Sequence, residues 1–384
     1  MKIFHSSDWH IGKKVNGVSM IEDQKVSLEG LMKLIETEEP DVLIIAGDLY
    51  DRAIPPVEAV ALLNKTLTTL ITKYNIKVIT ISGNHDSGDR INFASNILRY
   101  KGLYIMGDES RLFDKVEIGN VHFYLVPYKH PNSIKALIDT QINIQSHEDA
   151  MRYTIDLIRQ QMDITVVNVM IAHGYVSKLS DKTDYESAGI QVSTSEKPLA
   201  IGGTDIMDYR IFDGFDYVAL GHLHGRQSVG REGVRYSGSL CKYSFSETRQ
   251  IKSITEIDIT QTLNIKYHNL PVNRDFRVIE GEINDLIAQG RKEMSQDYIH
   301  AIITNEGELL NPIARLREVY PNILSLVKKS KLEAELGDIT AVNKSKNPFE
   351  LFEDFYKTCS DSNYNTQKQD YVKSIIEEAL EENL

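Results

Sequence analysis

The N-terminal part of the chain alternates short apolar runs with longer segments whose apolar positions recur three or four residues apart. The runs Lys2–His5, Val42–Ala46 and Val78–Ser82 have the length and composition of β-strands. Between them, Glu22–Glu38 shows helical spacing, and a second helix is predicted from Pro55-Pro56 to about Tyr74. This β-α-β-α-β order predicts a sheet with helices packed against it.

The pattern becomes more varied in the middle of the chain. Val116–Pro127 predicts two strands joined by a Gly119-Asn120 turn, which implies antiparallel additions, and Ser146–Met162 predicts a helix. Residues 232–268 contain three strand-like runs, which we expect to complete a second sheet. Residues 178–215 are polar and contain Gly202-Gly203, and this stretch fits either a functional loop or a disordered insertion.

A separate unit is predicted to begin near Pro271. It has β-α-β-α-β order, over Phe276–Glu282, Ile283–Gly290, Tyr298–Asn305, Pro312–Tyr320 and Ile323–Lys328. We therefore expect a main domain at 1–270, a small second domain at 271–330, a polar linker at 331–347 and a helical tail at 348–384. The tail has apolar residues at helical spacing, which suits docking on a partner or packing against its own protein. The candidate partner-binding residues are Phe349, Leu351, Phe352, Phe355 and Tyr356.

Composition and charge narrow the range of functions. The 384 residues are 41% hydrophobic and 26% charged, and no apolar stretch is long enough to span a membrane. Cys241 and Cys359 lie far apart, and no signal segment precedes the first strand, so we expect a cytoplasmic protein with structural cysteines. The net charge is −12. If the substrate is nucleic acid, metal ions or a partner must supply much of the binding.

Metal-binding side chains follow five of the strand-like runs. Asp8-Trp9-His10, Gly47-Asp48 and Gly83-Asn84-His85-Asp86 come first, and His173-Gly174 and Gly221-His222-Leu223-His224 follow Val166–Ala172 and Tyr217–Leu220. Side chains at strand ends converge on one edge of a sheet. Carboxylate and amide oxygens together with imidazoles suit Mn, Fe or Zn. The sequence therefore predicts a site for two divalent ions.

The ligands can be divided between the two ions. A two-metal phosphoesterase needs a bridging carboxylate and an activated water. Asp48 is the predicted bridge, because it ends the most buried strand and follows a glycine. The expected first set is Asp8, His10 and His224, and the expected second set is Asn84, His173 and His222.

Three neighbouring residues are candidates for roles other than metal binding. His85 could protonate the leaving oxygen or stabilise the transferring phosphoryl group. Asp51 could accept the other ring N–H of His85 and fix its tautomer. Arg52 fits either a phosphate clamp or an ordinary surface salt bridge. Asp86 and His5 carry no specific signal beyond proximity.

These motifs resemble the calcineurin-type metallophosphoesterase superfamily, and over the whole chain the sequence resembles the SbcD family of bacterial nuclease subunits. The most specific parts are Phe4–Gly12, Ser82–Ser87 and Asp213–His224. The resemblance implies an α+β fold: a two-sheet αββα sandwich with a small α/β capping domain and a C-terminal helical segment. The metal ligands and the leaving-group histidine of the family fall on the residues named above.

The resemblance also implies an activity and partners. It implies a Mn²⁺-dependent 3′→5′ exonuclease on double-stranded DNA and an endonuclease on single strands and hairpins, acting in repair and recombination. The partner would be an SbcC-type ATPase of the SMC class, in a two-plus-two assembly that contains a homodimer. Eukaryotic and archaeal relatives have a histidine in place of Asp51. The role of that histidine in exonuclease action therefore cannot be carried over to Asp51. Gly47–Arg52 instead resembles the Gly-Asp-x-x-Asp-Arg of serine/threonine phosphatases, in which the aspartate orients the histidine.

Three other functions compete with a DNA nuclease. The same ions serve a phosphomonoesterase or protein phosphatase, but phosphatases usually have Glu where Asp86 stands, and a small-substrate enzyme has no need of a second domain and a tail. A cyclic-nucleotide phosphodiesterase is favoured only by His222-x-His224. A scaffold that has lost its metals is disfavoured by the complete ligand set.

Overall fold

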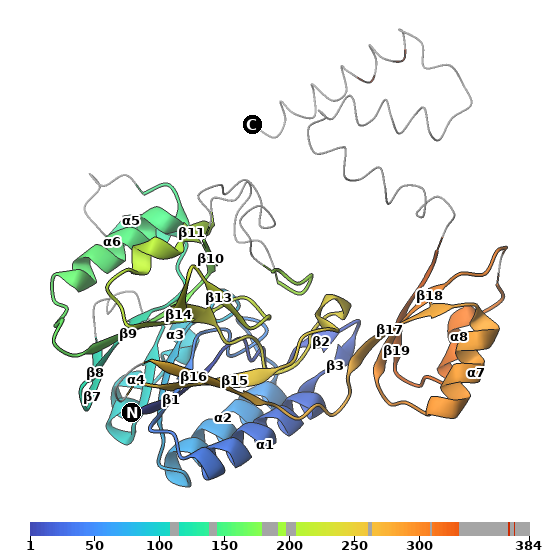
Figure 1. Ribbon diagram of the computed structural model, residues 1–384, viewed down its shortest axis with the longest axis horizontal. Coiled ribbons are helices and arrows are strands. Elements are labelled where there is room, and N and C mark those ends of the chain that lie inside the picture. Colours follow the sequence, from blue (N-terminus) through green and yellow to red (C-terminus); the bar gives the residue numbers. More distant parts are fainter. Residues whose placement is uncertain are drawn as a thin grey trace.

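The computed structural model describes residues 1–107, 115–137, 144–178, 191–196, 205–259, 263–307 and 309–329, together with Lys368 and Val372. Two six-stranded sheets form the main body (Figure 1). A cluster of buried residues from both sheets, including Ile44, Ile79, Phe123 and Val169, fills the space between them. The fold is therefore the α+β two-sheet sandwich that the sequence predicts.

The first sheet contains the strands of the predicted β-α-β-α-β segment. Its order is β16-β15-β1-β4-β5-β6, in which β1, β4, β5 and β6 are parallel and β15 and β16 are antiparallel to their neighbours. The bounds are β1 (Lys2–Ser6), β4 (Val42–Ile45), β5 (Lys77–Ile81), β6 (Leu103–Met106), β15 (Ser253–Asp258) and β16 (Asn264–Asn269).

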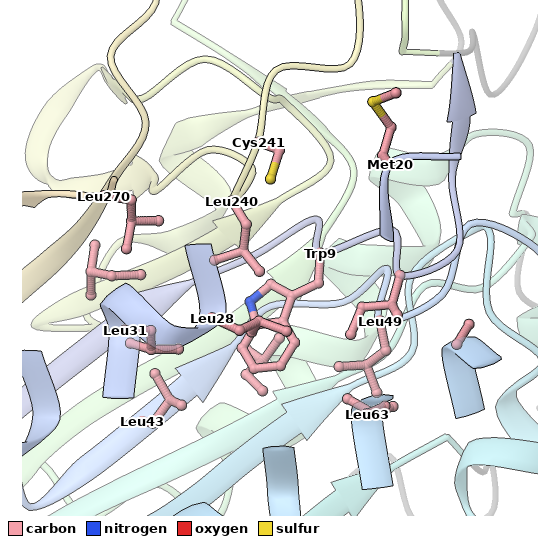
Figure 2. Packing of buried hydrophobic residues seen from close by; sticks show 14 of the residues in the cluster. Trp9, Met20, Leu28, Leu31, Leu43, Leu49, Leu63, Leu240, Cys241 and Leu270 are labelled. Carbon is pink, nitrogen blue, oxygen red and sulfur yellow. The ribbon is translucent and has the colours of Figure 1, made fainter. Parts of the chain in front are cut away.

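Two helices cover the outer face of this sheet. Helix α1 (Ile21–Glu38) ends at Glu39, which has left-handed backbone and precedes Pro40, and α2 (Val57–Thr72) begins directly after Pro55-Pro56. Both lie close to the predicted positions. The core between these helices and the sheet contains Trp9, with Leu28, Leu31, Leu43 and Leu63 in the same cluster (Figure 2). Burial of Trp9 thus anchors the turn that carries Asp8 and His10.

The second sheet has the order β13-β14-β12-β9-β8-β7. The predicted hairpin at 116–127 is present as two antiparallel strands, and the predicted helix is α6 (His147–Arg159), which begins with a capping box between Ser146 and Asp149. Helix α6 packs on the outer face of this sheet (Figure 1). The bounds are β7 (Lys115–Ile118), β8 (Val121–Val126), β9 (Val167–His173), β12 (Tyr217–Gly221), β13 (Gln227–Val229) and β14 (Arg231–Tyr236).

The expectation that residues 232–268 complete the second sheet is wrong for two of the three runs. Only β14 joins that sheet, parallel to β12, whereas β15 and β16 extend the first sheet. Strand β15 pairs with β1, with Lys2 opposite Asp258 and His5 opposite Thr255. Without β15, β1 would have an unpaired edge, so the pairing satisfies backbone groups that the sequence does not reveal.

Shorter elements occupy the connections. They are β2 (Lys14–Val15), β3 (Val18–Ser19), α3 (Gly88–Ile91), α4 (Ser95–Leu98), η1 (Arg99–Lys101), α5 (Pro131–Leu137), β10 (Tyr175–Ser177), β11 (Ile206–Asp208), η4 (Tyr209–Phe212) and η5 (Phe245–Glu247). Among the described helices, none has the length and apolar character needed to cross a bilayer. Within the 178–215 stretch, β11 and η4 are ordered elements, and Gly202-Gly203 lies outside the described residues.

A three-stranded parallel sheet forms a smaller unit beside the main body (Figure 1). Its elements are β17 (Phe276–Gly281), α7 (Ile283–Glu293), β18 (Tyr298–Ile303), α8 (Pro312–Arg317) and β19 (Ile323–Lys328). The unit has a hydrophobic cluster of its own and contacts α1 through Asp23, whose carboxylate accepts hydrogen bonds from Asn273, Arg274 and the Tyr298 hydroxyl. The predicted linker, Cys359 and the five candidate partner-binding residues of the tail lie outside the described residues.

Candidate metal centre

The predicted metal ligands come from the ends of strands in both sheets. Asp8 and His10 follow β1, Asp48 follows β4, and Asn84 follows β5. The other three ligands come from the second sheet, where His173 ends β9 and His222 and His224 follow β12. The carboxyl ends of these parallel strands meet at one edge of the sandwich, so the structure brings all seven side chains together there.

The backbone is strained at this edge. Four donor residues have positive φ angles, at 51° for Asp8, 43° for His10, 50° for Asp48 and 109° for His222. Residues other than glycine rarely adopt this conformation, and each instance costs of order 1–3 kcal/mol. Such strain concentrates at functional sites, where the surrounding structure imposes it.

Three glycines leave room for the donors. A Cβ added at Gly83 would lie 2.1 Å from Asp48 Oδ1, and one at Gly47 would lie 2.4 Å from His173 Nδ1. At Gly221 the added atom would lie 1.8 Å from the Ala46 carbonyl oxygen. Each of these motifs therefore contains glycine next to the ligand because a side chain there would displace a neighbouring ligand or its backbone.

The donors form two groups that share one carboxylate. Asp8, His10 and His224 have ligand atoms within 4.8 Å of one another, and so do Asp48, His173 and His222. Asp48 Oδ2 lies 3.6 Å from His10 Nε2 and 3.5 Å from His173 Nε2, so it reaches both groups. Asp48 therefore lies within reach of both groups, and the division of ligands between two ions stays a prediction.

Asn84 belongs to the second group. Its Oδ1 lies 3.0 Å from His173 Nε2 and 2.9 Å from His222 Nδ1. In the first group, the Nε2 atoms of His10 and His224 face each other at 3.1 Å. Oxygen acceptors and ring nitrogens that converge in this way suit divalent cations that take mixed N and O ligands.

Some ionisable groups of the centre are held in the form that binds metals, whereas Asp8, His173 and His224 have raised pKa values and must lose a proton when a cation binds. Asp8 and Asp48 are fully buried, and burial raises the pKa of Asp8. Burial acts in the same direction on Asp48, but the neighbouring His173, His10 and His85 together outweigh it and hold the pKa of Asp48 well below its usual range. Burial also lowers the pKa of His10 and of His222, which keeps both imidazoles neutral. Neutral imidazoles and ionised carboxylates are the forms that bind metals.

His85 lies beside the first group, but its partner differs from the expected one. Its Nδ1 lies 2.8 Å from the main-chain oxygen of Asp51, and its ring lies edge-on to His10 with centroids 4.7 Å apart. The Asp51 carboxylate instead accepts a 2.7 Å salt bridge from Lys13. His85 thus makes a carbonyl–imidazole contact in place of the expected carboxylate–imidazole contact, and the carboxylate binds Lys13 while lying within 4.8 Å of the ring nitrogens of His10 and His85.

Asp86 and Arg52 also lie close to the predicted ligands. Asp86 accepts three backbone hydrogen bonds, from Leu49, Tyr50 and Gly83, each at 3.0 Å, and so ties the Asp48 loop to the Asn84 loop. In the sequence, only the position of Asp86 directly after Asn84-His85 indicated that it lies near the site. The Arg52 side chain is 58% exposed, with Nη2 3.9 Å from Asp51 Oδ2, which is a surface ion pair.

Sequence reasoning missed the residues that contact His224 from outside the ligand set. Its Nδ1 lies 2.9 Å from Ser195 Oγ and 3.3 Å from Glu247 Oε1. Both residues lie far from His224 along the chain and follow no strand-end motif, so no sequence signal marked them.

Comparisons with known proteins find two matching family models and a similar curated protein. A family model described as calcineurin-like phosphoesterase matches residues 1–226, and one described as type 5 capsule protein repressor C-terminal domain matches residues 272–359. The chain is 33% identical over 379 residues to the SbcD component of the nuclease SbcCD of Staphylococcus epidermidis, with 98% of each chain covered.

Two solved structures show weaker likeness. The protein TT1561 of Thermus thermophilus is 10% identical, with 70% of this chain and 99% of that chain covered and a TM-score of 0.41. The phosphoesterase Yfce from E. coli is 13% identical, with 71% of this chain and 100% of that chain covered and a TM-score of 0.27.

Proposed function

The chain belongs to the calcineurin-like phosphoesterase family and, within it, to the SbcD family of nuclease components, and from this premise we propose that it is a Mn²⁺-dependent DNA nuclease. It is a hydrolase that acts on phosphodiester bonds. The observation that carries the proposal is the pair of buried donor groups that share Asp48. We further propose 3′→5′ exonuclease activity on duplexes and endonuclease activity on single strands and hairpins.

The proposed ligands of one ion are Asp8, His10 and His224, those of the other are Asn84, His173 and His222, and Asp48 lies between them. Two bound divalent ions supply a water of lowered pKa and offset charge on the phosphate. The chain keeps these donors in place through the left-handed turns after β1 and β4 and through the fully buried Trp9. Mixed N and O donors support Mn²⁺ as the ion.

His85 is the proposed general acid. Its Nδ1–H donates to the Asp51 carbonyl, which fixes the ring and leaves Nε2 for the substrate. When water attacks phosphorus and the P–O bond to the leaving oxygen breaks, that oxygen takes a proton from Nε2 of His85, and the proton that the attacking water releases to solvent is balanced when His85 takes one up again. Asp51 is then a positioning residue through its main chain, and Arg52, at the rim, is available to bind a phosphate oxygen.

The test is cleavage of an end-labelled DNA duplex by the full-length chain with Mn²⁺, beside a His85→Ala variant and an aryl phosphomonoester. We expect shortened DNA from the wild type and a loss of about 10²- to 10⁴-fold in the variant, with metal content unchanged. Ester hydrolysis with intact DNA, both alone and with the ATPase partner and ATP, would favour a phosphomonoesterase instead.

We propose the domain division 1–270, 271–330, 331–347 and 348–384, in which 271–330 caps the nuclease domain and the tail binds an SbcC-type ATPase. The relative's printed name describes it as one component of SbcCD, which supports a partner of this kind. The proposed contact residues are Phe349, Leu351, Phe352, Phe355 and Tyr356. Because the substrate is DNA, we place the protein in the cytoplasm, with roles in repair and recombination.

We also propose that two copies associate within a two-plus-two assembly. An apolar cavity of about 770 Å³ lies between α2 and the α3–α4 segment, with Ile54 and Phe93 in its lining. Phe93 is 81% exposed, and Val57, Ile97 and Tyr100 are also exposed nearby in the sequence. Two copies that each carry a net charge of −12 repel each other, so burial of this apolar surface, rather than attraction between charges, is what supports their association.

A further inference from the structure

His224 has different kinds of neighbour at its two ring nitrogens. Its Nε2 faces His10 Nε2 at 3.1 Å, on the side of the metal ligands. Its Nδ1 faces away from them, 2.9 Å from Ser195 Oγ and 3.3 Å from Glu247 Oε1. Because a carboxylate only accepts, the proton of neutral His224 resides on Nδ1 and the lone pair on Nε2.

Ser195 connects His224 to the buried Glu247. Its hydroxyl lies 2.6 Å from Glu247 Oε1, so it accepts from Nδ1–H and donates to the carboxylate. Glu247 is fully buried and forms a 2.6 Å salt bridge with Lys252, whose side chain is 3% exposed. The remaining Lys252 hydrogen bonds go to the His224 carbonyl at 2.9 Å, Ser239 Oγ at 2.9 Å and Gln250 Oε1 at 2.6 Å. The buried ion pair is therefore fully satisfied, which is the condition under which such pairs persist.

The segment that carries Ser195 is fastened to the same ligand loop. Glu196 Oε1 accepts from the His224 backbone N–H at 2.5 Å, and its Oε2 accepts from the Ser193 N–H at 2.7 Å. Thr194 bonds instead to Ser246 Oγ, through its backbone N–H at 3.0 Å and through its hydroxyl at 3.3 Å. Ser195 and Thr194 are thus neighbours in sequence, but only Ser195 touches a metal ligand.

The second group of ligands lacks an arrangement of this kind among the described residues. His173 Nδ1 donates to the Ala46 carbonyl at 2.8 Å, which is a neutral acceptor. A carboxylate that accepts the distal N–H makes a metal-bound imidazole a stronger ligand than a carbonyl does, and removing such a partner typically costs about 10- to 100-fold in metal affinity. The two proposed ion sites therefore differ, because a carboxylate lies near the distal nitrogen of His224 and a neutral carbonyl contacts that of His173.

We propose that Ser195, Glu247 and Lys252 are positioning residues for the first metal ion. They act on this ion through His224 and do not act on the second ion. The salt bridge from Lys252 fixes the Glu247 carboxylate, which in turn orients the Ser195 hydroxyl. Ser195 and Glu247 then hold Nδ1 of His224, so that its Nε2 points toward the ion. The inference rests on the proposed function, since the ion is that of the phosphoesterase.

The test is titration of the metal-depleted, full-length chain with Mn²⁺ by calorimetry, which needs no turnover. We expect Ser195→Ala to weaken one of two Mn²⁺ sites by about 10- to 100-fold and to leave the other unchanged. Ser195→Thr keeps the hydroxyl and should restore the affinity, and the matched control Thr194→Ala should bind both ions as the wild type does.

A second variant and a spectrum separate positioning from folding. Glu247→Gln combined with Lys252→Gln removes both buried charges together, so neither is left unpaired, and should weaken the same site. With Co²⁺ in place of Mn²⁺, the visible absorption of the weakened site should change in Ser195→Ala and not in Thr194→Ala. Unchanged affinities in Ser195→Ala, or equal weakening of both sites, would overturn the proposal. A wild-type chain that binds no Mn²⁺ would overturn the proposed function itself.

Discussion

Replacement of Gly83 by alanine tests whether the position of Asp48 controls the chemistry. The added Cβ would lie 2.1 Å from Asp48 Oδ1 and 2.5 Å from the Asp48 backbone nitrogen. Ordinary contacts lie near about 3.5 Å, so Asp48 must move by roughly 1 Å, and a misplacement of that size costs about 100-fold in rate. The φ angle of Gly83 is not in the left-handed region, so the effect comes from the contact alone.

The assay is kcat/KM on a labelled oligonucleotide with Mn²⁺, together with metal content and Tm. Gly225→Ala is the matched control, because its added Cβ meets only the flexible ends of two side chains, Gln250 at 3.1 Å and Gln227 at 3.9 Å. We expect a loss of about 100-fold in Gly83→Ala and little change in Gly225→Ala. A Gly83→Ala enzyme with wild-type kcat/KM would show that the chemistry tolerates displacement of the shared carboxylate, and the reasoning would fail.

Three further predictions concern Asp51, pH and self-association. Asp51→Asn keeps the main-chain contact to His85, so turnover should fall less than about tenfold, and activity as low as that of His85→Ala would show that the carboxylate acts directly. Burial lowers the pKa of His173, but Asp48, Asp8 and the Ala46 carbonyl together outweigh it and raise that pKa from 6.5 to about 9. The protonated ring stabilises the metal-free fold below pH 6.5, and this stabilisation is lost as the pH rises to about 9. Differential scanning calorimetry in EDTA should show Tm falling across this window while Mn²⁺ affinity, measured by titration, rises; a Tm that stays level would contradict the assignment. Phe93→Ser should shift the mass measured by light scattering toward that of the monomer. The control Ile164→Ser changes an 83% exposed residue outside the proposed surface and should leave the mass unchanged. Equal masses for the two variants would contradict the proposed dimer surface.

The parts of the fold and site that sequence predicted are those with a local signature. Asp8, Asp48 and His173 each follow an apolar run of strand length, and strand ends converge by topology alone. The contact of His85 could not be predicted, because a main-chain carbonyl as partner is independent of residue type. Glu247 was missed for a related reason: it acts from a short 3-10 helix, and only the folded chain places it beside His224.

The same limit applies to the sheets. The apolar run of β15 predicts a strand but not its neighbour, and its pairing with β1 depends on which edge remains open after the parallel strands have formed. Tertiary pairing therefore decided between two sheets that were equally compatible with the local pattern.

The position of β1 has a consequence for the order of events during synthesis. Strand β1 leaves the ribosome before the other strands of its sheet, yet one of its two partners, β15, lies at Ser253–Asp258, near the end of the sandwich. The donors from the second sheet also come late, since His222 and His224 follow β12. Pairings over such sequence separations form slowly. A nascent chain that stops short of β15 thus leaves β1 half paired, and the proposed metal centre lacks His222 and His224 until the segment after β12 has been synthesised.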